Sequence, residues 1–241
     1  MRSAGLAILI ILVINFTSTV QARETLVIAI AEDPPYHNAQ GTGFVNVLER
    51  EVMNRVGYDV RFDKLPSERA LLYANEGISD GVADRVIGID KYYPNLIRVN
   101  EPVMTWNFVA FSRRTDIRIN GWQSIKPYSL GIVNGWKILE RNTEDALFRT
   151  KVRNIDLLFT LLKNGRADLV LTEVWQGLFY LKKHPINNVK LLYPILVSKV
   201  QFMYLHKKHR KLAPKIAEAL RGMKKDGSYQ KIVDKILTPL K

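Results

Sequence analysis

One pattern occurs twice in the sequence, once in each half. The first copy is NEGISDGVADR, residues 75–85, and the second is KNGRADLVLTE, residues 163–173. In each copy a helical stretch stops at a glycine, an aspartate follows three residues later, and a short apolar run ends in a charged residue. Although Gly-x-x-Asp is a common sequence, the shared context favours a true repeat. It predicts two domains of like design, one presenting Arg85 and the other Glu173 at the end of a strand.

Strand-like and helical stretches alternate along the rest of the chain. Strands are predicted at 25–31, 58–62, 82–83, 128–133 and 169–172. Helices are predicted at 43–56, 67–76, 155–164, 175–183 and 213–237, the last with a break at Asp226-Gly227. This alternation predicts an α/β fold with largely parallel sheets.

The first 22 residues resemble an export signal. Arg2 precedes an apolar run at 6–16, and Val20-Gln21-Ala22 offers the small residues at which a signal peptidase cleaves. The run is shorter than the roughly 20 residues of a membrane span. We therefore predict a signal peptide at 1–22, with an uncleaved anchor helix as the alternative. No later run is long enough to cross a bilayer, so we expect no integral membrane segment after cleavage.

The chain contains no cysteine. This excludes disulfides, a thiolate nucleophile, a cysteine-ligated metal and a lipid anchor carried on cysteine. An exported protein without an anchor is retained if a second membrane encloses it, so we predict a periplasmic location. The four histidines lack metal-binding spacing, and we predict neither a metal nor a cofactor.

The chain is basic, with 36 Lys and Arg against 23 Asp and Glu and a formal net charge of +13. Such a charge can indicate nucleic acid or an anionic membrane as partner. The basic residues are scattered, however, and the densest groups, 207–211 and 224–225, fall on predicted surfaces. We expect a solvated basic face and no nucleic-acid binding; attraction to an acidic ligand or cell envelope stays open.

Ligands of open α/β sheets bind beyond the carboxyl ends of the strands. At these ends Arg85 could grip a carboxylate with two parallel hydrogen bonds, and Glu173 could receive an ammonium. The turn Asn134-Gly135 could add backbone donors at the start of a helix. Further candidates are the aromatic walls and one more cation: Tyr36, Trp106, Trp136, Trp175 and Arg69. No catalytic residue is predicted.

Each candidate also has a structural interpretation. Arg85 could pair with Asp84 or Asp80, and Glu173 could cap the following helix. The turn could be a plain turn, any single tryptophan could be core packing, and Arg69 could face solvent.

Several phrases together resemble a known family. They are EDPPY, GTGFVNVLEREV, GISDG, NEPV followed by FVAFSRR, SLGIVNGW, NGRADLVLTE and EALRGMKKDGSYQKIVDKI. In order and spacing the chain resembles the bacterial extracellular solute-binding protein family 3, the periplasmic amino-acid-binding type, over essentially its whole length after the leader.

The resemblance implies the type II periplasmic binding fold, with two lobes of mostly parallel sheet joined by two hinge strands near 109–113 and 192–201. The tail from about residue 207 would return to the first lobe. The predicted division is 23–110 plus 200–241 for lobe 1 and 111–199 for lobe 2.

The resemblance also implies a function. A monomer would close around a small polar ligand, an amino acid or related zwitterion, and present it to an ABC-type permease or a membrane sensor. In this family an acid at the position of Glu173 holds the ligand ammonium, and a first-lobe arginine holds its carboxylate. Three departures leave the ligand open: Glu173 replaces the usual Asp, the usual arginine follows a Ser/Thr-rich turn several residues beyond Arg85, and Trp136 replaces a common hydroxyl residue.

Two other functions fit the sequence. Relatives of the family include periplasmic cyclohexadienyl dehydratases, and a desolvated Glu173 could act as the acid of such an enzyme, although spacing shows no second acid–base partner. An accessory domain that binds cell-wall fragments or a protein partner would account for the basic surface.

Overall fold

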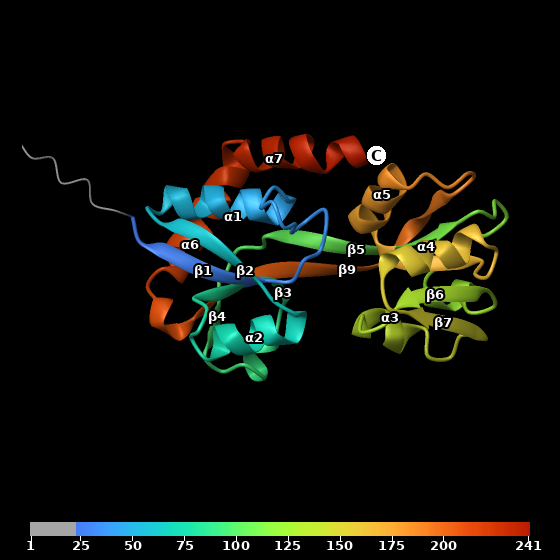
Figure 1. Cartoon of the computed structure of the whole chain (residues 1–241), viewed down its shortest axis with the longest axis horizontal. Coiled ribbons are helices and arrows are strands. Elements are labelled where there is room, and N and C mark those ends of the chain that lie inside the picture. The colour runs from blue at the N-terminus through green and yellow to red at the C-terminus, as the bar shows by residue number, and fades with distance from the viewer. Residues whose placement is uncertain (1–22) are drawn as a thin grey trace, which may run out of the picture.

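The computed structural model describes residues 23–241, so the predicted leader at 1–22 lies outside the described residues. The chain forms two lobes bridged by two long strands, β5 (Met104–Ser112) and β9 (Lys190–His206) (Figure 1). The first lobe holds β1 (Thr25–Ile30), α1 (Phe44–Arg55), β2 (Asp59–Lys64), α2 (Ser67–Asn75), β3 (Gly81–Val86), η1 (Ile89–Lys91), β4 (Leu96–Arg98), η3 (Lys207–His209), α6 (Ala213–Lys225), α7 (Ser228–Ile236) and η4 (Thr238–Leu240).

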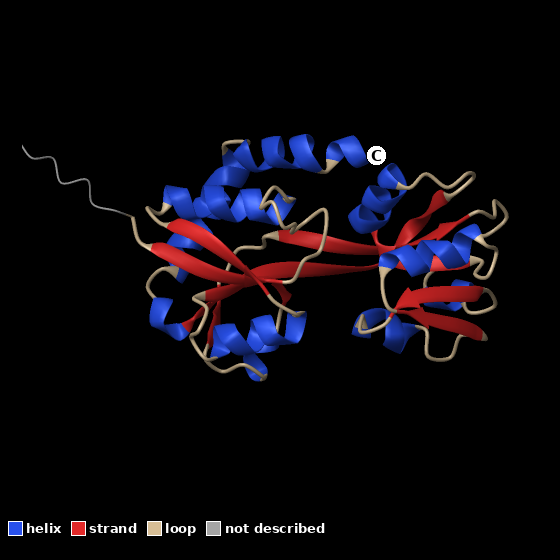
Figure 2. Ribbon diagram, viewed as in Figure 1, coloured by secondary structure: helices blue, strands red, loops and turns tan. Residues whose placement is uncertain are grey.

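The second lobe is built from the middle of the chain. It holds η2 (Trp122–Ile125), β6 (Ser129–Val133), α3 (Lys137–Asn142), β7 (Phe148–Val152), α4 (Ile155–Lys163), β8 (Leu169–Glu173) and α5 (Val174–Lys183) (Figure 2). The predicted return of the tail to the first lobe, and the break between α6 and α7, are both present.

The strands of residues 23–241 form one continuous sheet in the order β2-β1-β3-β9-β5-β8-β6-β7, with β4 paired to β9. In the first lobe β1 runs parallel to β2 and β3, and in the second β6 runs parallel to β7 and β8. The bridging strands are antiparallel to their neighbours. The predicted two-lobed α/β class is therefore confirmed.

The two bridging strands pair with each other on both sides of the point where they cross, but in a different register on each side. Residues 104–108 of β5 pair with 201–197 of β9, and residues 110–112 pair with 192–190, so the register shifts between Phe108 and Ala110. The hinge strands predicted near 109–113 and 192–201 overlap β5 and β9, and β5 extends further toward its start, from Met104 to Ser112. Its first half was missed because Thr105 and Asn107 interrupt the apolar run.

Each lobe has its own hydrophobic core. In the first, Phe44 and Leu48 of α1 pack with Leu220 of α6, and in the second, Leu130 and Leu169 pack with Leu139 of α3. A second cluster lies in each lobe, around Leu71 in the first and Phe159 in the second, so apolar burial stabilises each lobe about its own residues. The residue boundaries predicted for the lobes stay a prediction.

Two short strands, β4 and β7, were not predicted, whereas α3 lies where a helix was expected after Asn134-Gly135. The strand β4 has three residues, and β7 is an edge strand with the half-exposed sequence FRTKV, so neither carries a long apolar run. Among the helices of residues 23–241, none combines the length and the apolarity that crossing a bilayer requires. Over the same residues, no three His, Asp or Glu side chains gather as metal ligands would.

Candidate functional site

Three aromatic rings from different elements stack where the lobes meet. Tyr36 lies in the β1–α1 loop, Trp106 on β5, and Trp136 at the start of α3. The ring centroids of Tyr36 and Trp106 are 5.6 Å apart with planes 14° from parallel, and those of Trp106 and Trp136 are 5.9 Å apart at 28°. Trp106 packs against the cores of both lobes. The fold thus brings three of the four predicted aromatic residues together.

Carboxyl groups surround the hydroxyl end of Tyr36. Burial raises the pKa of Tyr36 well above its usual value, and the negative charges of Glu173, Asp33 and Asp84 raise it further. The ring is fully buried, and its hydroxyl, although close to Glu173, makes no hydrogen bond of acceptable geometry within residues 23–241. A buried hydroxyl without a partner is costly, so a group placed here would be bound readily.

Glu173 ends β8 and is fully buried. One carboxylate oxygen accepts from the backbone N–H groups of Trp175 (2.8 Å) and Gln176 (3.2 Å), and the other accepts from that of Asn107 (3.3 Å). Burial raises the pKa of Glu173 to about 7, although these hydrogen bonds lower it. The structure thus contains the helix cap considered as the alternative for this residue. Its role as an ammonium receptor stays a prediction.

Asp33 joins the lobes. It lies in the loop after β1, and the Gln176 side-chain amide of α5 donates a hydrogen bond to its carboxylate. Burial, together with the charges of Asp84 and Glu173, raises the pKa of Asp33 well above its usual value, while Arg85 lowers it. Sequence reasoning left Asp33 and Gln176 out of the site. The EDPPY phrase could have indicated Asp33, since it puts an acid directly beyond the carboxyl end of a strand.

Arg85 lies near the carboxyl end of β3 and is half-buried. Its Nη1 donates to the backbone oxygen of Asp84 at 3.0 Å, whereas Nε and Nη2 are buried and have no partner among the described residues. The carboxylate of Asp84 instead pairs with His37 at 2.8 Å, and that of Asp80 with Lys208 and His209. The structure therefore does not show the Arg85 ion pairs that we considered as the alternative.

Arg85 and Glu173 belong to the same cluster. Both lie near enough to Asp33 for their charges to act on its carboxyl group, one lowering its pKa and the other raising it. A further acid, Glu49 of α1, is fully buried with both oxygens unpaired within residues 23–241, and burial raises its pKa well above the usual value. Glu49 was missed because it lies on a helix read as simply amphipathic.

The other predicted residues lie elsewhere. Arg69 is exposed on α2. Trp175 packs against the first-lobe core, with the ammonium of Lys241 5.5 Å from its ring centre. Asn134 and Gly135 are exposed, and the Gly135 N–H donates to Glu140 of the same lobe at 3.0 Å. The structure gives these residues local roles, and their predicted contact with a ligand stays a prediction.

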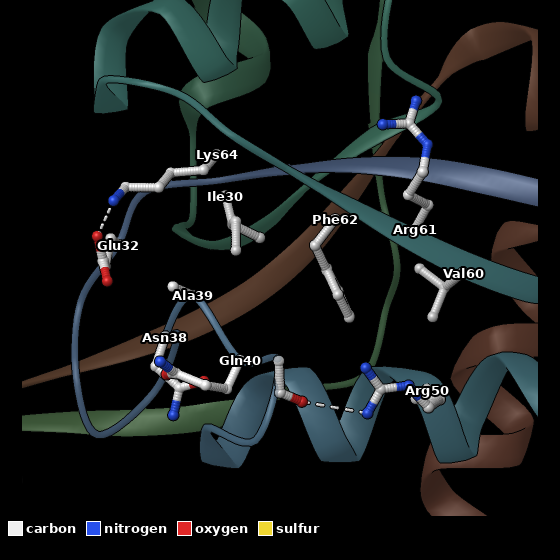
Figure 3. A pocket seen from close by; sticks show the side chains of 11 residues that line it. Ile30, Glu32, Asn38, Ala39, Gln40, Arg50, Val60, Arg61, Phe62 and Lys64 are labelled. Carbon is white, nitrogen blue, oxygen red and sulfur yellow. Dashed lines mark hydrogen bonds and ion pairs between the residues drawn. The ribbon is translucent and has the colours of Figure 1, made fainter.

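A separate cavity of about 290 Å³ lies on the first lobe between β1, β2 and α1 (Figure 3). Its charged side chains are engaged with one another or with backbone. Lys64 pairs with Glu32, and Arg50 donates to the Gly41 oxygen at 3.2 Å while lying over the Phe62 ring. None of the predicted site residues lines it.

Comparisons with known proteins bear on the fold. No family model matches the chain. An uncharacterized protein of Shewanella oneidensis is 26% identical over 223 residues, covering 89% of this chain and 83% of that protein. An ancestral arginine-binding protein bound to arginine superposes with a TM-score of 0.70 over 89% of this chain and 98% of that one, at 24% identity. This is the periplasmic binding protein fold.

Two further solved structures share this fold. The GluR0 ligand-binding core from Nostoc punctiforme, in complex with L-glutamate, has a TM-score of 0.70 at 20% identity, over 88% of this chain and 98% of that one. A histidine kinase sensor domain has a TM-score of 0.72 at 17% identity, over 89% and 96%. At these identities the likeness to the periplasmic binding protein fold concerns the architecture alone.

Proposed function

We propose that this chain is an exported solute-binding protein whose lobes close around a small polar ligand of the amino-acid type. Its fold is shared with proteins whose names specify arginine or L-glutamate as ligand, and with the substrate-binding protein of an amino acid ABC transporter. In such a fold the ligand stabilises the closed form because it contacts both lobes at once.

One observation carries the proposal: Arg85 keeps two buried N–H donors unpartnered, in a cluster that also contains acidic side chains of both lobes. A buried guanidinium with open donors is a preformed site for a carboxylate. Asp33 of the first lobe and Glu173 of the second carry the opposite charge to Arg85, so an ammonium group of the ligand would be favoured beside them. Beside these charged groups, Tyr36 of the first lobe and Trp136 of the second stack on Trp106.

The rest of the proposal follows from the sequence. Residues 1–22 would direct export and be removed, leaving a monomer in the periplasm. Lobe 1 would comprise 23–110 and 200–241, and lobe 2 would comprise 111–199. The closed form would be recognised by a permease or a membrane sensor. The fold is shared with a histidine kinase sensor domain and with the substrate-binding protein of an amino acid ABC transporter, so the choice between these two partners stays open.

A thermal-shift screen of the purified chain against amino acids, polyamines and small carboxylates tests the proposal. A ligand at 100 times its dissociation constant adds about 2.7 kcal/mol to the free energy of unfolding. Each kcal/mol raises the melting midpoint by roughly 2–4 °C for a chain of this size. We expect at least one such compound to raise the midpoint by several degrees. A flat screen across all three classes would contradict the proposal.

A second candidate, a lyase on the same scaffold, is favoured by one property of Glu173. Its burial and its pKa of about 7 are those of a carboxyl group that can hold a proton and deliver it at neutral pH. Assay of the chain for dehydration of cyclohexadienyl hydroxy acids tests this function. Turnover that is lost in Glu173→Gln, while ligand binding persists, would support it, and absence of turnover in the unaltered chain would rule it out.

A further inference from the structure

The cluster between the lobes contains more acids than cations. From the β1–α1 loop come Asp33 and His37, from β3 come Asp84 and Arg85, from β8 comes Glu173, and Glu49 of α1 lies beneath them. His37 is committed to Asp84, with its Nε2 2.8 Å from the carboxylate, and its Nδ1 contacts Asn46 at 3.2 Å. Among the described residues, Arg85 is the cation whose charge acts on Asp33, whereas two carboxyl groups, those of Asp84 on β3 and Glu173 on β8, act on it with the opposite sign.

The aromatic stack ends among these acids. The Tyr36 hydroxyl is fully buried beside Glu173, and the charges of Glu173, Asp33 and Asp84 all act on it. The indole Nε1 of Trp106, the next ring in the stack, is buried without a hydrogen-bond partner within residues 23–241. Stacked electron-rich rings beside carboxylates form the usual environment of a bound organic cation.

The two open donors of Arg85 suit one anionic group of a ligand. The acidic and aromatic side chains around it suit more than one cationic group. We propose that the ligand carries a net positive charge: one carboxylate bound by Arg85, and an ammonium or guanidinium in addition to its α-ammonium, bound beside Asp33, Tyr36 and Trp106. This inference rests on the proposed function and narrows its ligand class from amino acids in general to cationic amino acids.

The titration of the acids supports the same conclusion. Burial raises the pKa of Asp33 well above its usual value and that of Glu173 to about 7, so Glu173 is partly protonated at neutral pH. A bound cation favours the ionised carboxylates and displaces protons into solvent. Cation binding at pH 7 is therefore expected to release protons, and Glu173, with a pKa of about 7, can contribute about half a proton per ligand.

Isothermal titration calorimetry of the purified chain tests the ligand class. The probes are L-arginine and L-lysine with net charge +1, L-glutamine with none, L-glutamate with −1, and putrescine, a dication without a carboxylate. We expect arginine or lysine to bind at least tenfold more tightly than glutamine, glutamate to bind most weakly, and putrescine to bind less tightly than the best cationic amino acid. Titration at pH 7 in phosphate and in Tris measures proton release.

Variants locate the effect. Asp33→Asn keeps a partner for Gln176 but removes one charge, so the preference for cations over glutamine is expected to fall about tenfold. Glu218→Gln, an exposed acid on α6, is the matched control and should leave the preference unchanged.

The outcomes separate the two proposals. Tighter binding of glutamine or glutamate, or proton uptake, would overturn the cationic ligand while leaving a solute-binding function intact. Putrescine binding as tight as arginine would overturn the carboxylate at Arg85. Absence of binding by every probe in a chain that is folded by circular dichroism would overturn this inference, and a flat wider screen would overturn the proposed function with it.

Discussion

The two copies of the repeated phrase fold in the same way up to their last residue. Helix α2 ends before Gly77 and helix α4 before Gly165, and both glycines have positive φ, +73° and +66°. The aspartate three residues later then binds the first strand of its own lobe. Asp80 donates its N–H to the Val27 oxygen at 2.7 Å and accepts the Val27 N–H at 2.8 Å.

Asp168 repeats both contacts with Ser129 of β6. Its N–H donates to the Ser129 oxygen at 2.9 Å, and its carboxylate accepts the Ser129 N–H at 3.0 Å. In each lobe the aspartate thereby fixes the register between two parallel strands, β3 on β1 and β8 on β6. The repeated phrase is a repeated structure.

The copies diverge where their strands end. Helix α5 begins directly after β8, so the carboxylate of Glu173 is used to cap that helix. After β3 the chain enters a turn and the short η1, so no α-helix begins beside Arg85. Its Nε and Nη2 have no hydrogen-bond partner among the described residues. The difference teaches that one charged end is hydrogen-bonded to its own lobe, whereas the other keeps two nitrogens without a partner within residues 23–241.

The largest effect is expected for Arg85→Ala. Loss of a buried partner to a ligand carboxylate costs about 2–5 kcal/mol. Ligand affinity should therefore fall by about 30-fold to several thousandfold, since each 1.4 kcal/mol is tenfold, while the free energy of unfolding changes little. Calorimetry with the best-binding compound of the screen measures the ligand affinity, and urea denaturation measures the free energy of unfolding. Arg221→Ala, an exposed arginine on α6, is the control, and equal affinity in the two variants would break the contrast between the lobes.

The next effect concerns pH and Glu173. An unfolded glutamate loses its proton near pH 4.5, whereas Glu173 in the folded chain does so near pH 7. Between these values the folded state binds the extra proton, so this residue makes stability fall as pH rises, by about 3 kcal/mol. Glu173→Gln should flatten this slope in urea denaturation at pH 4.5, 5.5, 7 and 8. An unchanged slope would mean that the carboxyl group ionises as an exposed one does.

A smaller and symmetrical effect is expected for the two aspartates. Burial alone raises the pKa of each, but hydrogen bonds from Lys208, Val27 and His209 to Asp80, and from Ser129 and Arg114 to Asp168, lower it overall. Removal of a charged hydrogen-bond acceptor costs about 1.5–3 kcal/mol. Asp80→Ala and Asp168→Ala should therefore lower the free energy of unfolding by similar amounts. A cost confined to one lobe would show that the contacts are not equivalent.

The smallest effect is expected at the two glycines. Alanine in the left-handed region costs about 1–2 kcal/mol. At Gly165 a Cβ atom would meet no heavy atom within 4 Å, whereas at Gly77 it would approach the His206 ring at 3.2 Å. Gly165→Ala should thus cost about 1 kcal/mol, and Gly77→Ala somewhat more. Thermal denaturation of the pair measures the difference, and the reverse order would contradict the crowding at His206.

Local patterns in the sequence determined much of the fold. Periodicity and glycine stops predicted the helices and buried strands, because these depend on neighbours within one turn or one strand. The repeat predicted two lobes with Arg85 and Glu173 at equivalent strand ends. Polar interruption hid the first half of β5, and low apolarity hid the edge strand β7.

The site was decided by the tertiary structure. Asp33, Gln176 and Glu49 entered the cluster through contacts between segments far apart in the chain. Trp175 of α5 packs against the first-lobe core and Arg69 of α2 is exposed, positions that local sequence patterns did not specify. Sequence specifies which residues carry charge and where strands end, because those properties are local. Which of these charged groups become buried without a hydrogen-bond partner depends on how the lobes pack. Only the tertiary structure therefore distinguishes a charge that is paired within the protein from one that keeps unpaired polar atoms.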